Sequence, residues 1–233
     1  RRDRKEGTGM SDTDWDVDFF FDPVCPFAWQ TSRWLRRVAE LRTLNVNWRF
    51  ICLRIINEDR DYAAEFPPNY EEAHGRGRSL LRVCAAVREA VGPEPIGAMY
   101  EAFGNELWSR RPSETSFSGV MAALSNEVDV EGILIGLGLD PALAAAADDG
   151  SWDDVLRSET ALAFARTGPD VGTPILTFGP PDGNSFFGPV ISMIPSDDEA
   201  LALYDAVATL ASMSTFSELK RTKRPPLDLP LLD

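Results

Sequence analysis

The hydrophobic pattern changes from strand-like to helical near the beginning of the chain. Residues 15–21 alternate and then become continuously apolar, which is typical of a strand entering a buried sheet. From Pro26 onward, apolar residues recur at three- and four-residue spacing with arginines between them, which predicts an amphipathic helix. Residues 45–56 form a second apolar run. The order strand, helix, strand predicts a right-handed crossover between two parallel strands.

The middle of the chain carries no convincing strand pattern. Residues 57–69 are polar and contain prolines, which indicates a loop. From Tyr70 to about Phe164 the pattern predicts helices separated by glycine and proline. These helices are expected at 79–91, 96–108, 117–125, 130–137, 141–147 and 152–165.

Strand signals return towards the C-terminus. Residues 174–178 and 185–187 flank a turn rich in Gly, Pro and Asn, which predicts a hairpin. Residues 196–215 are expected to form a final amphipathic helix, because Ser196 and the acidic residues after it suit a helix N-terminus. The sequence thus predicts an α/β protein, a thioredoxin-like sheet with a large inserted α-helical lid.

This fold implies a division of the chain into parts. Residues 1–9 lack the apolar region of a secretory signal, so they are expected to be an artificial or upstream remnant with Met10 as the natural start. The expected parts are a disordered or artificial N-terminus (1–13), a first thioredoxin-like part (14–57), an inserted helical domain (58–168), a second thioredoxin-like part (169–222) and an extended tail (223–233).

Composition excludes several classes of protein. Of the 233 residues, 44% are hydrophobic and 26% are charged, as in an ordinary soluble domain. No apolar run approaches the roughly 20 residues that span a bilayer, so no membrane partner is expected. A net charge of −14 argues against nucleic acid as a partner. Three cysteines and one histidine argue for a reducing cytoplasm and against zinc sites and Ser-His-Asp triads, and no metal is expected.

Cys25 is the strongest candidate for chemistry. It follows the first strand and stands at the start of the first helix, where backbone N–H groups favour a thiolate and a lowered pKa. A thiolate is the attacking species in disulfide exchange. The second cysteine of a Cys-x-x-Cys pair would stand at position 28, which is Ala28. An external thiol must therefore resolve any mixed disulfide on Cys25. The alternative is that Cys25 is only a small buried hydrophobe.

Short motifs in a fixed order carry a family resemblance. They are Phe-Asp-Pro-Val-Cys-Pro at 21–26, Val-Gly-Thr-Pro at 171–174, Phe-Phe-Gly-Pro-Val at 186–190 and Glu-Leu-Lys-Arg-Thr at 218–222. The chain resembles the DsbA-like thioredoxin superfamily, and within it the actinobacterial cytoplasmic mycothiol-dependent reductases. Relatives that are kappa-class glutathione transferases or 2-hydroxychromene-2-carboxylate isomerases carry Ser at the nucleophile position, so Cys25 favours the redox branch. Ala28 and Phe27 depart from the family, which has Cys and usually Trp there.

The resemblance implies a set of site residues and a co-substrate. It implies mycothiol as the low-molecular-weight thiol, and a cis-proline turn at Thr173-Pro174 beside the Cys25 thiol. An ordinary proline at a strand start is the alternative for that turn. The remaining cleft residues implied are Pro26 and Phe27 at the helix start, Asn57 and Tyr70 at the start of the lid, and Trp108, which with Phe27 would form an aromatic wall. Capping of the loop by Asn57, and core packing of Tyr70 and Trp108, remain open alternatives.

The other cysteines and the histidine are expected to have structural roles. Cys52 lies late in the second strand, where it could approach Cys25, but a buried strand cysteine is the default. Cys84 is expected in the core of a helix, and His74, in a stretch rich in Gly and Arg, on the surface.

Three functions follow from these observations. The first is a cytoplasmic thiol-dependent oxidoreductase or transferase, in which Cys25 attacks a disulfide or an electrophilic substrate and mycothiol supplies the second thiol. The second is an isomerase or transferase of the kappa-class or chromene-carboxylate type, in which Cys25 only positions bound mycothiol. The third is a binding module that has kept the fold and lost turnover.

Overall fold

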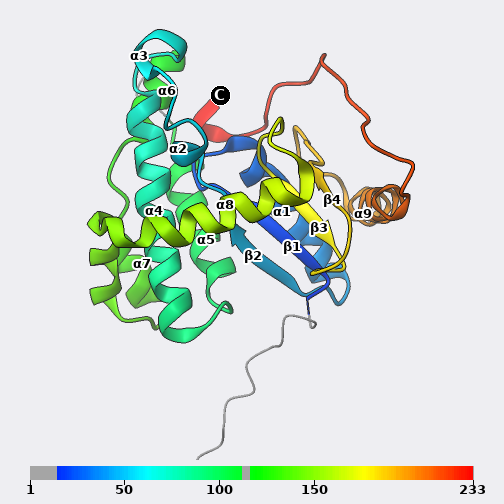
Figure 1. Cartoon of the computed structure of the whole chain (residues 1–233), viewed down its shortest axis with the longest axis horizontal. Helices are drawn as coiled ribbons and strands as arrows, with labels where there is room; N and C mark the ends of the chain where they lie inside the picture. The colour runs from blue at the N-terminus through cyan, green and yellow to red at the C-terminus, as the bar shows by residue number, and fades with distance from the viewer. Residues whose placement is uncertain (1–14, 112–115, 233) are drawn as a thin grey trace, which may run out of the picture.

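The computed structural model describes residues 15–111 and 116–232. The predicted N-terminal segment 1–13, with Met10, lies outside the described residues. A four-stranded sheet has the order β2-β1-β3-β4 (Figure 1). The strands are β1 (Val17–Phe21), β2 (Val46–Phe50), β3 (Ile175–Phe178) and β4 (Ser185–Phe187). β1 is parallel to β2, as the crossover predicts, and antiparallel to β3; β3 and β4 form the predicted antiparallel hairpin.

One helix joins the parallel strands, and most of the others lie between β2 and β3. The bounds are α1 (Pro26–Leu41), α2 (Leu53–Ile56), α3 (Tyr62–Glu65), α4 (Tyr70–Val91), α5 (Ile96–Trp108), α6 (Phe117–Leu124), α7 (Val130–Gly136), η1 (Pro141–Asp148), η2 (Gly150–Trp152), α8 (Asp153–Thr167), α9 (Asp197–Ser212) and η3 (Pro230–Leu232). Figure 1 shows α4 to α7 gathered beside the sheet. Within the described ranges, no helix is long and apolar enough to cross a membrane.

Several predicted boundaries are wrong, and two of them concern helix ends: α4 begins at Tyr70 rather than at residue 79, and α9 ends at Ser212 rather than at residue 215. The second strand, expected over 45–56, ends at Phe50, and the chain turns into α2 because the backbone N–H of Leu53 bonds to the Asp22 carboxyl group. The expected loop 57–69 contains the short helix α3, which Asp61 caps through a bond from the Ala64 N–H. The helix expected at 141–147 is a 3-10 helix, η1.

The two faces of the sheet bury different apolar clusters. Side chains alternate along a strand, so Phe19 and Phe21 join the main core, while Phe20 joins a smaller cluster with Ile175 and Ala163 of α8. α8 therefore covers one face of the sheet (Figure 1), although it belongs to the segment that the sequence assigned to the lid. α1 and α9 pack together and belong to the main-core side.

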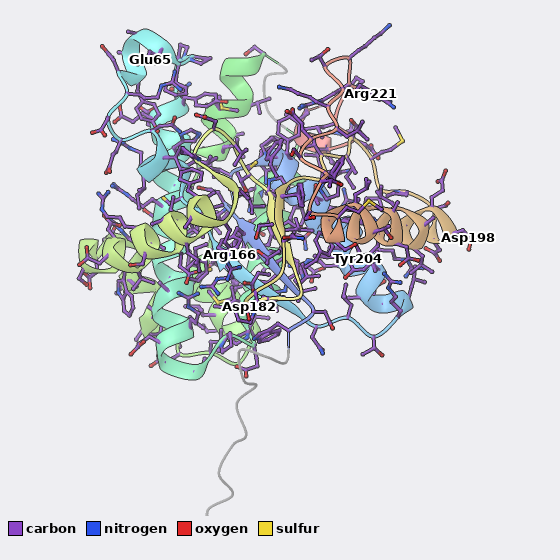
Figure 2. The ribbon with its side chains drawn as sticks, turned by 45° about the vertical axis from the view of Figure 1, so that its right-hand side comes forward. Glu65, Arg166, Asp182, Asp198, Tyr204 and Arg221 are labelled. Atoms are coloured by element: carbon purple, nitrogen blue, oxygen red, sulfur yellow. The ribbon has the colours of Figure 1, made fainter. Side chains whose placement is uncertain are left out.

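A buried ion-pair network lies between α8 and the sheet. Asp18 of β1 is 1% exposed, and Arg166 of α8 donates to it over 2.7 Å. Arg49 of β2 lies 3.6 Å from Asp18 and makes a bidentate pair with Glu159 of α8, with N–O distances of 2.7 and 3.0 Å. Figure 2 shows Arg166 over the sheet. The charges thus fix α8 in register with the central strands.

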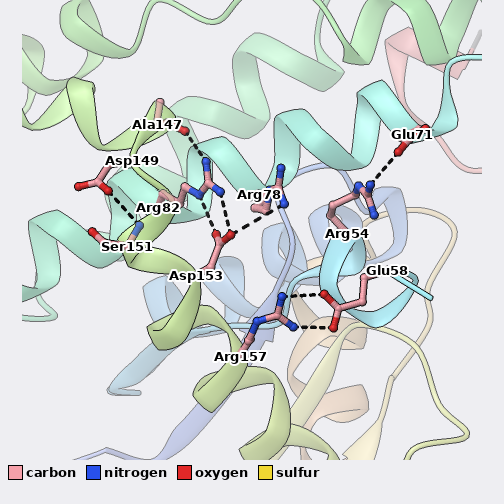
Figure 3. Close-up of polar contacts among 10 residues, drawn as sticks. All are labelled: Arg54, Glu58, Glu71, Arg78, Arg82, Ala147, Asp149, Ser151, Asp153 and Arg157. Carbon is pink, nitrogen blue, oxygen red and sulfur yellow. Dashed lines mark hydrogen bonds and ion pairs between the residues drawn. The ribbon is translucent and has the colours of Figure 1, made fainter. Parts of the chain in front are cut away.

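A second set of ion pairs joins the helical segment to α8. Arg82 of α4 donates to both carboxylate oxygens of Asp153, over 2.7 and 2.8 Å (Figure 3). Arg157 of α8 makes a bidentate pair with Glu58, which follows α2, and one of its bonds is 2.7 Å long. Arg54 makes a further pair from α2 to α4. These contacts hold α2 and α4 against the helix that covers the sheet.

The C-terminal tail, predicted to be extended, is docked at its end. Leu229 and Leu231 are both 0% exposed and belong to the main core. η3 packs against α5. Residues 230–232 form η3 in place of the extended segment predicted there, and the buried leucines dock this end of the tail on the core.

The buried network leads to a test of stability. Arg166→Ala leaves Asp18 buried without its closest cation, and we expect it to lower the free energy of unfolding by about 3 kcal/mol. Arg42→Ala is the matched control, because the Arg42–Asp205 pair is exposed and should contribute less than about 1 kcal/mol. Urea unfolding measures both variants. Equal losses would contradict a special role for the buried network.

Candidate active site

Cys25 lies at the N-terminus of α1, directly after the loop that follows β1. Its Sγ accepts a bond from the Ala28 N–H over 3.4 Å, so the thiol caps the helix. Pro26 occupies the first helical position, where its missing N–H is no loss. On the other side, the thiol donates to the carbonyl oxygen of Thr173 over 3.5 Å. The sulfur thus lies between the start of α1 and the chain entering β3.

Asp22 organises the loop that carries Cys25. Its carboxyl group is 0% exposed and accepts from the Val24 N–H over 3.0 Å and from the Leu53 N–H over 2.8 Å. It therefore joins the ends of the parallel strands β1 and β2. Burial raises the pKa of Asp22 to about 7, against the opposing effect of the two N–H donors. At Gly77 of α4 a Cβ would collide with the Asp22 carboxyl oxygen, so glycine permits the close approach of that helix.

Thr173 and Pro174 stand opposite Cys25. The peptide bond between them is cis, and both residues are buried. The Thr173 hydroxyl donates to the carbonyl oxygen of Phe20 over 3.3 Å, which ties this turn to β1. The Thr173 carbonyl is in consequence held towards the thiol, as the resemblance implied for this turn.

The aromatic residues predicted for the cleft lie in different environments. Phe27 is half-buried, and the Arg224 guanidinium lies over its ring at 5.7 Å. Tyr70 is also half-buried, at the start of α4, and stacks on Phe66 with ring centroids 5.3 Å apart. Burial raises the pKa of Tyr70, and the charge of Cys25 makes a smaller contribution to the rise.

Trp108 and Asn57 have structural contacts. Trp108 is 1% exposed, and its indole N–H donates to the Pro23 carbonyl over 3.0 Å. Trp108 thus supports the Cys25 loop from the core. The structure has the core packing of Trp108 that the sequence left open as an alternative. The Asn57 side chain donates to the Leu53 carbonyl over 2.8 Å and ends α2, which matches the capping alternative. Contact of either residue with a ligand stays a prediction.

His74 is buried, so its predicted surface position is wrong. It is 7% exposed, and its Nδ1 lies 2.9 Å from the Tyr62 hydroxyl. The rings of Phe66 and Tyr70 meet it edge-on. Burial lowers the pKa of His74 to about 4, so the ring is neutral at pH 7. The sequence pattern around His74 is polar, and two of its aromatic partners, Tyr62 and Phe66, come from the segment 57–69 that was predicted to be a loop.

All three cysteines are buried free thiols. Cys84 is 0% exposed in the core, as predicted. Cys52 is also 0% exposed, and its N–H donates to the Thr160 hydroxyl over 3.1 Å, which fits the default of a structural residue. Ala28 is itself fully buried, so a side chain at this position faces the interior beside Cys25. Among the described residues, no group of three or more His, Cys, Asp or Glu could hold a metal ion.

The expected lowering of the Cys25 pKa is wrong for this conformation. Burial raises the pKa of Cys25 to about 12, and the charge of Asp22 adds to the rise. The N–H of Ala28 opposes the rise and is outweighed. The sequence predicts that Cys25 stands at a helix N-terminus, but it does not predict the loss of water around the sulfur. This desolvation has the larger effect on the pKa of Cys25. The thiol is thus protected in this state.

Two parts of the site were not predicted from the sequence. Asp22 was noted only as part of a motif. A carboxylate that follows a strand and precedes a nucleophile is a sequence signal of a buried hydrogen-bond acceptor, and it could have identified Asp22. The tail residues Arg224, Leu229 and Leu231 were also missed. Alternating leucines near the end of the tail are the signal that could have identified its docking.

These features define a class of protein. The sheet order, the cysteine at the start of α1 and the Thr173 carbonyl opposite it are those of a DsbA-like thioredoxin fold with a helical insertion, which confirms the predicted fold class. A sequence model of the Rv2466c-like family, described as mycothiol-dependent nitroreductase Rv2466c, matches residues 24–221. The chain belongs to this family, and the resemblance given by its motifs is confirmed.

The chain is also similar to individual proteins and solved structures. The chain is 33% identical over 211 residues to the uncharacterized protein Rv2286c of Mycobacterium tuberculosis (strain ATCC 25618 / H37Rv), covering 90% of this chain and 83% of that protein. The structure of 2-hydroxychromene-2-carboxylate isomerase has a TM-score of 0.51 at 18% identity, covering 83% of this chain and 95% of the isomerase. The cytosolic disulfide reductase DsbM from Pseudomonas aeruginosa has a TM-score of 0.48 at 16% identity, covering 83% and 98%. The isomerase supports the fold alone.

The buried Asp22 carboxyl group leads to a pH prediction. Its pKa is raised from 3.8 to about 7 on folding, so between these values the folded protein holds more protons than the unfolded chain. Asp22 therefore contributes fully to the stability of the folded protein below pH 4. This contribution to the free energy of unfolding is lost as the pH rises through 7, at up to about 1.4 kcal/mol per pH unit. Asp22→Asn does not titrate, so its stability relative to the natural protein should rise across this window.

Denaturant unfolding of both proteins at several pH values measures this difference. Above about pH 8 the difference should level off, since Asp22 is then ionised in both states. A constant difference from pH 4 to pH 8 would contradict a raised pKa for Asp22.

Proposed function

We propose that this protein is a mycothiol-dependent thiol redox enzyme that works with one protein sulfur, Cys25. The observation that carries the proposal is the placement of Cys25, whose Sγ caps α1 and faces the Thr173 carbonyl, with Ala28 where a resolving cysteine would stand. Membership of a family described as mycothiol-dependent supports the choice of the second thiol. Phe27 and Tyr70, both half-buried, are proposed to contact the substrate or the small thiol, with Thr173 and Pro174 on the opposite side.

With a disulfide substrate the cycle has two exchanges. The Cys25 thiolate attacks one sulfur of the substrate disulfide, so that a mixed disulfide forms on Cys25 and the other half leaves as a thiolate. A mycothiol thiolate then attacks the sulfur of the substrate half, and Cys25 leaves as a thiolate. The products are one free thiol and one mixed disulfide of mycothiol, so no internal second cysteine is required.

An electrophilic nitro compound, the substrate type in the family's description, is the second substrate that we propose for the same thiol. Reduction of a nitro group to a nitroso group removes one oxygen as water and takes two electrons and two protons. The Cys25 thiol and one mycothiol thiol supply both, and the two sulfurs become a mixed disulfide. A second mycothiol attacks that disulfide, which releases Cys25 and forms mycothiol disulfide.

The cellular location is part of the proposal. A low cysteine count, with the described cysteines all free thiols, is typical of proteins in a reducing compartment. We therefore propose a cytoplasmic enzyme, where a small thiol at high concentration is present to resolve Cys25.

The proposal is tested by the intact mass of the reduced protein after mixing with mycothiol disulfide, followed by peptide mapping. We expect one mycothiol adduct, on Cys25, which free mycothiol removes. Cys25→Ser should form no adduct, and Cys84→Ser should behave as the natural protein because Cys84 lies in the core. Absence of an adduct on Cys25, or equal slow labelling of all cysteines, would overturn the redox proposal and favour a binding module.

Restoring the second cysteine gives a sharper test of the single-sulfur cycle. Ala28→Cys places a thiol one helical turn after Cys25, with little added volume at a buried position. In this variant the adduct on Cys25 should be short-lived, because the introduced thiol attacks it and releases mycothiol, leaving an internal disulfide. The natural protein should keep its adduct until free mycothiol is added. Ala28→Ser is the matched control and should keep the adduct too.

An adduct that disappears at the same rate in all three proteins would contradict the role assigned to position 28. The internal disulfide in Ala28→Cys is identified by its mass. The protein loses one mycothiol from the adduct and is then two hydrogens lighter than its reduced form.

A further inference from the structure

The C-terminal tail returns to the candidate site after leaving the thioredoxin-like unit. Figure 1 shows it leaving α9, looping above the sheet and coming back towards the start of α1. Its outer part, residues 217–226, is exposed throughout, and Figure 2 shows Arg221 on this part. The end of the tail is different, because Leu229 and Leu231 are completely buried. A long exposed segment therefore ends in a docked anchor.

One attachment of the tail lies beside the nucleophile. The Arg224 guanidinium lies 5.7 Å above the ring of Phe27, two residues after Cys25. Ser192 joins the tail to α1 through its backbone carbonyl, which accepts from the Gln30 side chain over 3.3 Å and from the Asp228 N–H over 2.8 Å. The Ser192 hydroxyl also donates to the carbonyl of Pro225 over 3.1 Å. The tail is thus tied to the helix that carries the thiol.

The other attachment lies on the helical insertion. η3, which carries Leu231, packs on α5. The last residue of α5, Trp108, donates its indole N–H to Pro23 in the Cys25 loop. Leu229, Leu231 and Cys25 belong to one apolar cluster. The tail is thus attached both to Phe27, at the start of α1, and to α5, whose Trp108 bonds to the Cys25 loop.

Cys25 itself is only 5% exposed in this arrangement. A disulfide exchange needs an attacking sulfur in line with the disulfide bond, and this approach requires open space at Sγ. The Cys25 thiol is therefore positioned for disulfide exchange, but in this conformation it is too buried for a disulfide to approach it.

We propose that residues 223–232 form a strap that closes the Cys25 site and that release of this strap exposes the thiol for reaction. The strap is suited to release because the attachments described for it are a few hydrogen bonds, one cation–π contact and the side chains of three leucines, Leu227, Leu229 and Leu231. None of its residues belongs to the sheet, so it can leave while the strands stay paired. The closed state protects a single reactive sulfur that has no internal partner.

The inference rests on the proposed function for its consequence in catalysis, but access to the thiol is measured without mycothiol. The probe is iodoacetamide, which a thiolate attacks at carbon to form a thioether while iodide leaves. Peptide mapping gives the labelling rate of each cysteine separately. Cys52 and Cys84, both 0% exposed, report any general unfolding within the same sample.

Two variants release the strap, and one serves as the control. Leu231→Asp places a charge in the buried anchor, and a chain ending at Pro226 lacks the anchor entirely. Leu219→Asp is the matched control, because Leu219 belongs to the same tail and is 84% exposed. We expect both release variants to label Cys25 about tenfold faster or more at neutral pH, since restoring water around the sulfur lowers its pKa and raises the thiolate fraction. Labelling of Cys52 and Cys84 should stay slow, and Leu219→Asp should match the natural protein.

Unchanged labelling of Cys25 in both release variants would overturn the strap. Faster labelling of all three cysteines would also overturn it, because the tail would then support the whole fold rather than one site. Selective labelling of Cys25 without any mycothiol adduct in the released variants would keep the strap and refute the proposed redox function. The two proposals therefore fail separately.

Discussion

The position of the nucleophile depends on the buried carboxyl group of Asp22. By accepting from the backbone of Val24 and of Leu53, it satisfies N–H groups at the ends of two parallel strands that would otherwise be buried without partners. The same bonds end β2, begin α2 and set the loop from which Cys25 caps α1. Because Gly77 lets α4 pack directly on this carboxyl group, the helical insertion and the thioredoxin-like sheet meet at the same point.

Two opposing effects act on the Cys25 sulfur. The helix N-terminus favours the thiolate through the Ala28 N–H, whereas loss of water favours the neutral thiol, and the second effect is larger in this conformation. A one-cysteine site has particular need of such protection, since an exposed thiolate without a resolving partner would be trapped by any disulfide it met. Burial and position together suit a site that is reactive only when opened.

The succession of elements was predictable because it depends on local periodicity. The strand before Cys25, the helix from Pro26, the helices of the insertion and the final hairpin all follow from spacing within a few residues. The errors occurred where a distant group decides the outcome. β2 stops early because Asp22, in the loop after β1, binds Leu53. His74 is buried because Tyr62 of the unpredicted helix α3 and Phe66 just after it cover the ring.

The sequence by itself determined the class of fold, the family, the candidate nucleophile and the absence of a cysteine at position 28, because each of these is a matter of residue identity and local order. Only the tertiary structure decided the state of the site. Whether Cys25 is a thiolate or a buried thiol, whether Trp108 faces a ligand or supports Pro23, and whether the tail is free or docked all depend on which surfaces lose water when remote segments pack, and no local pattern records that.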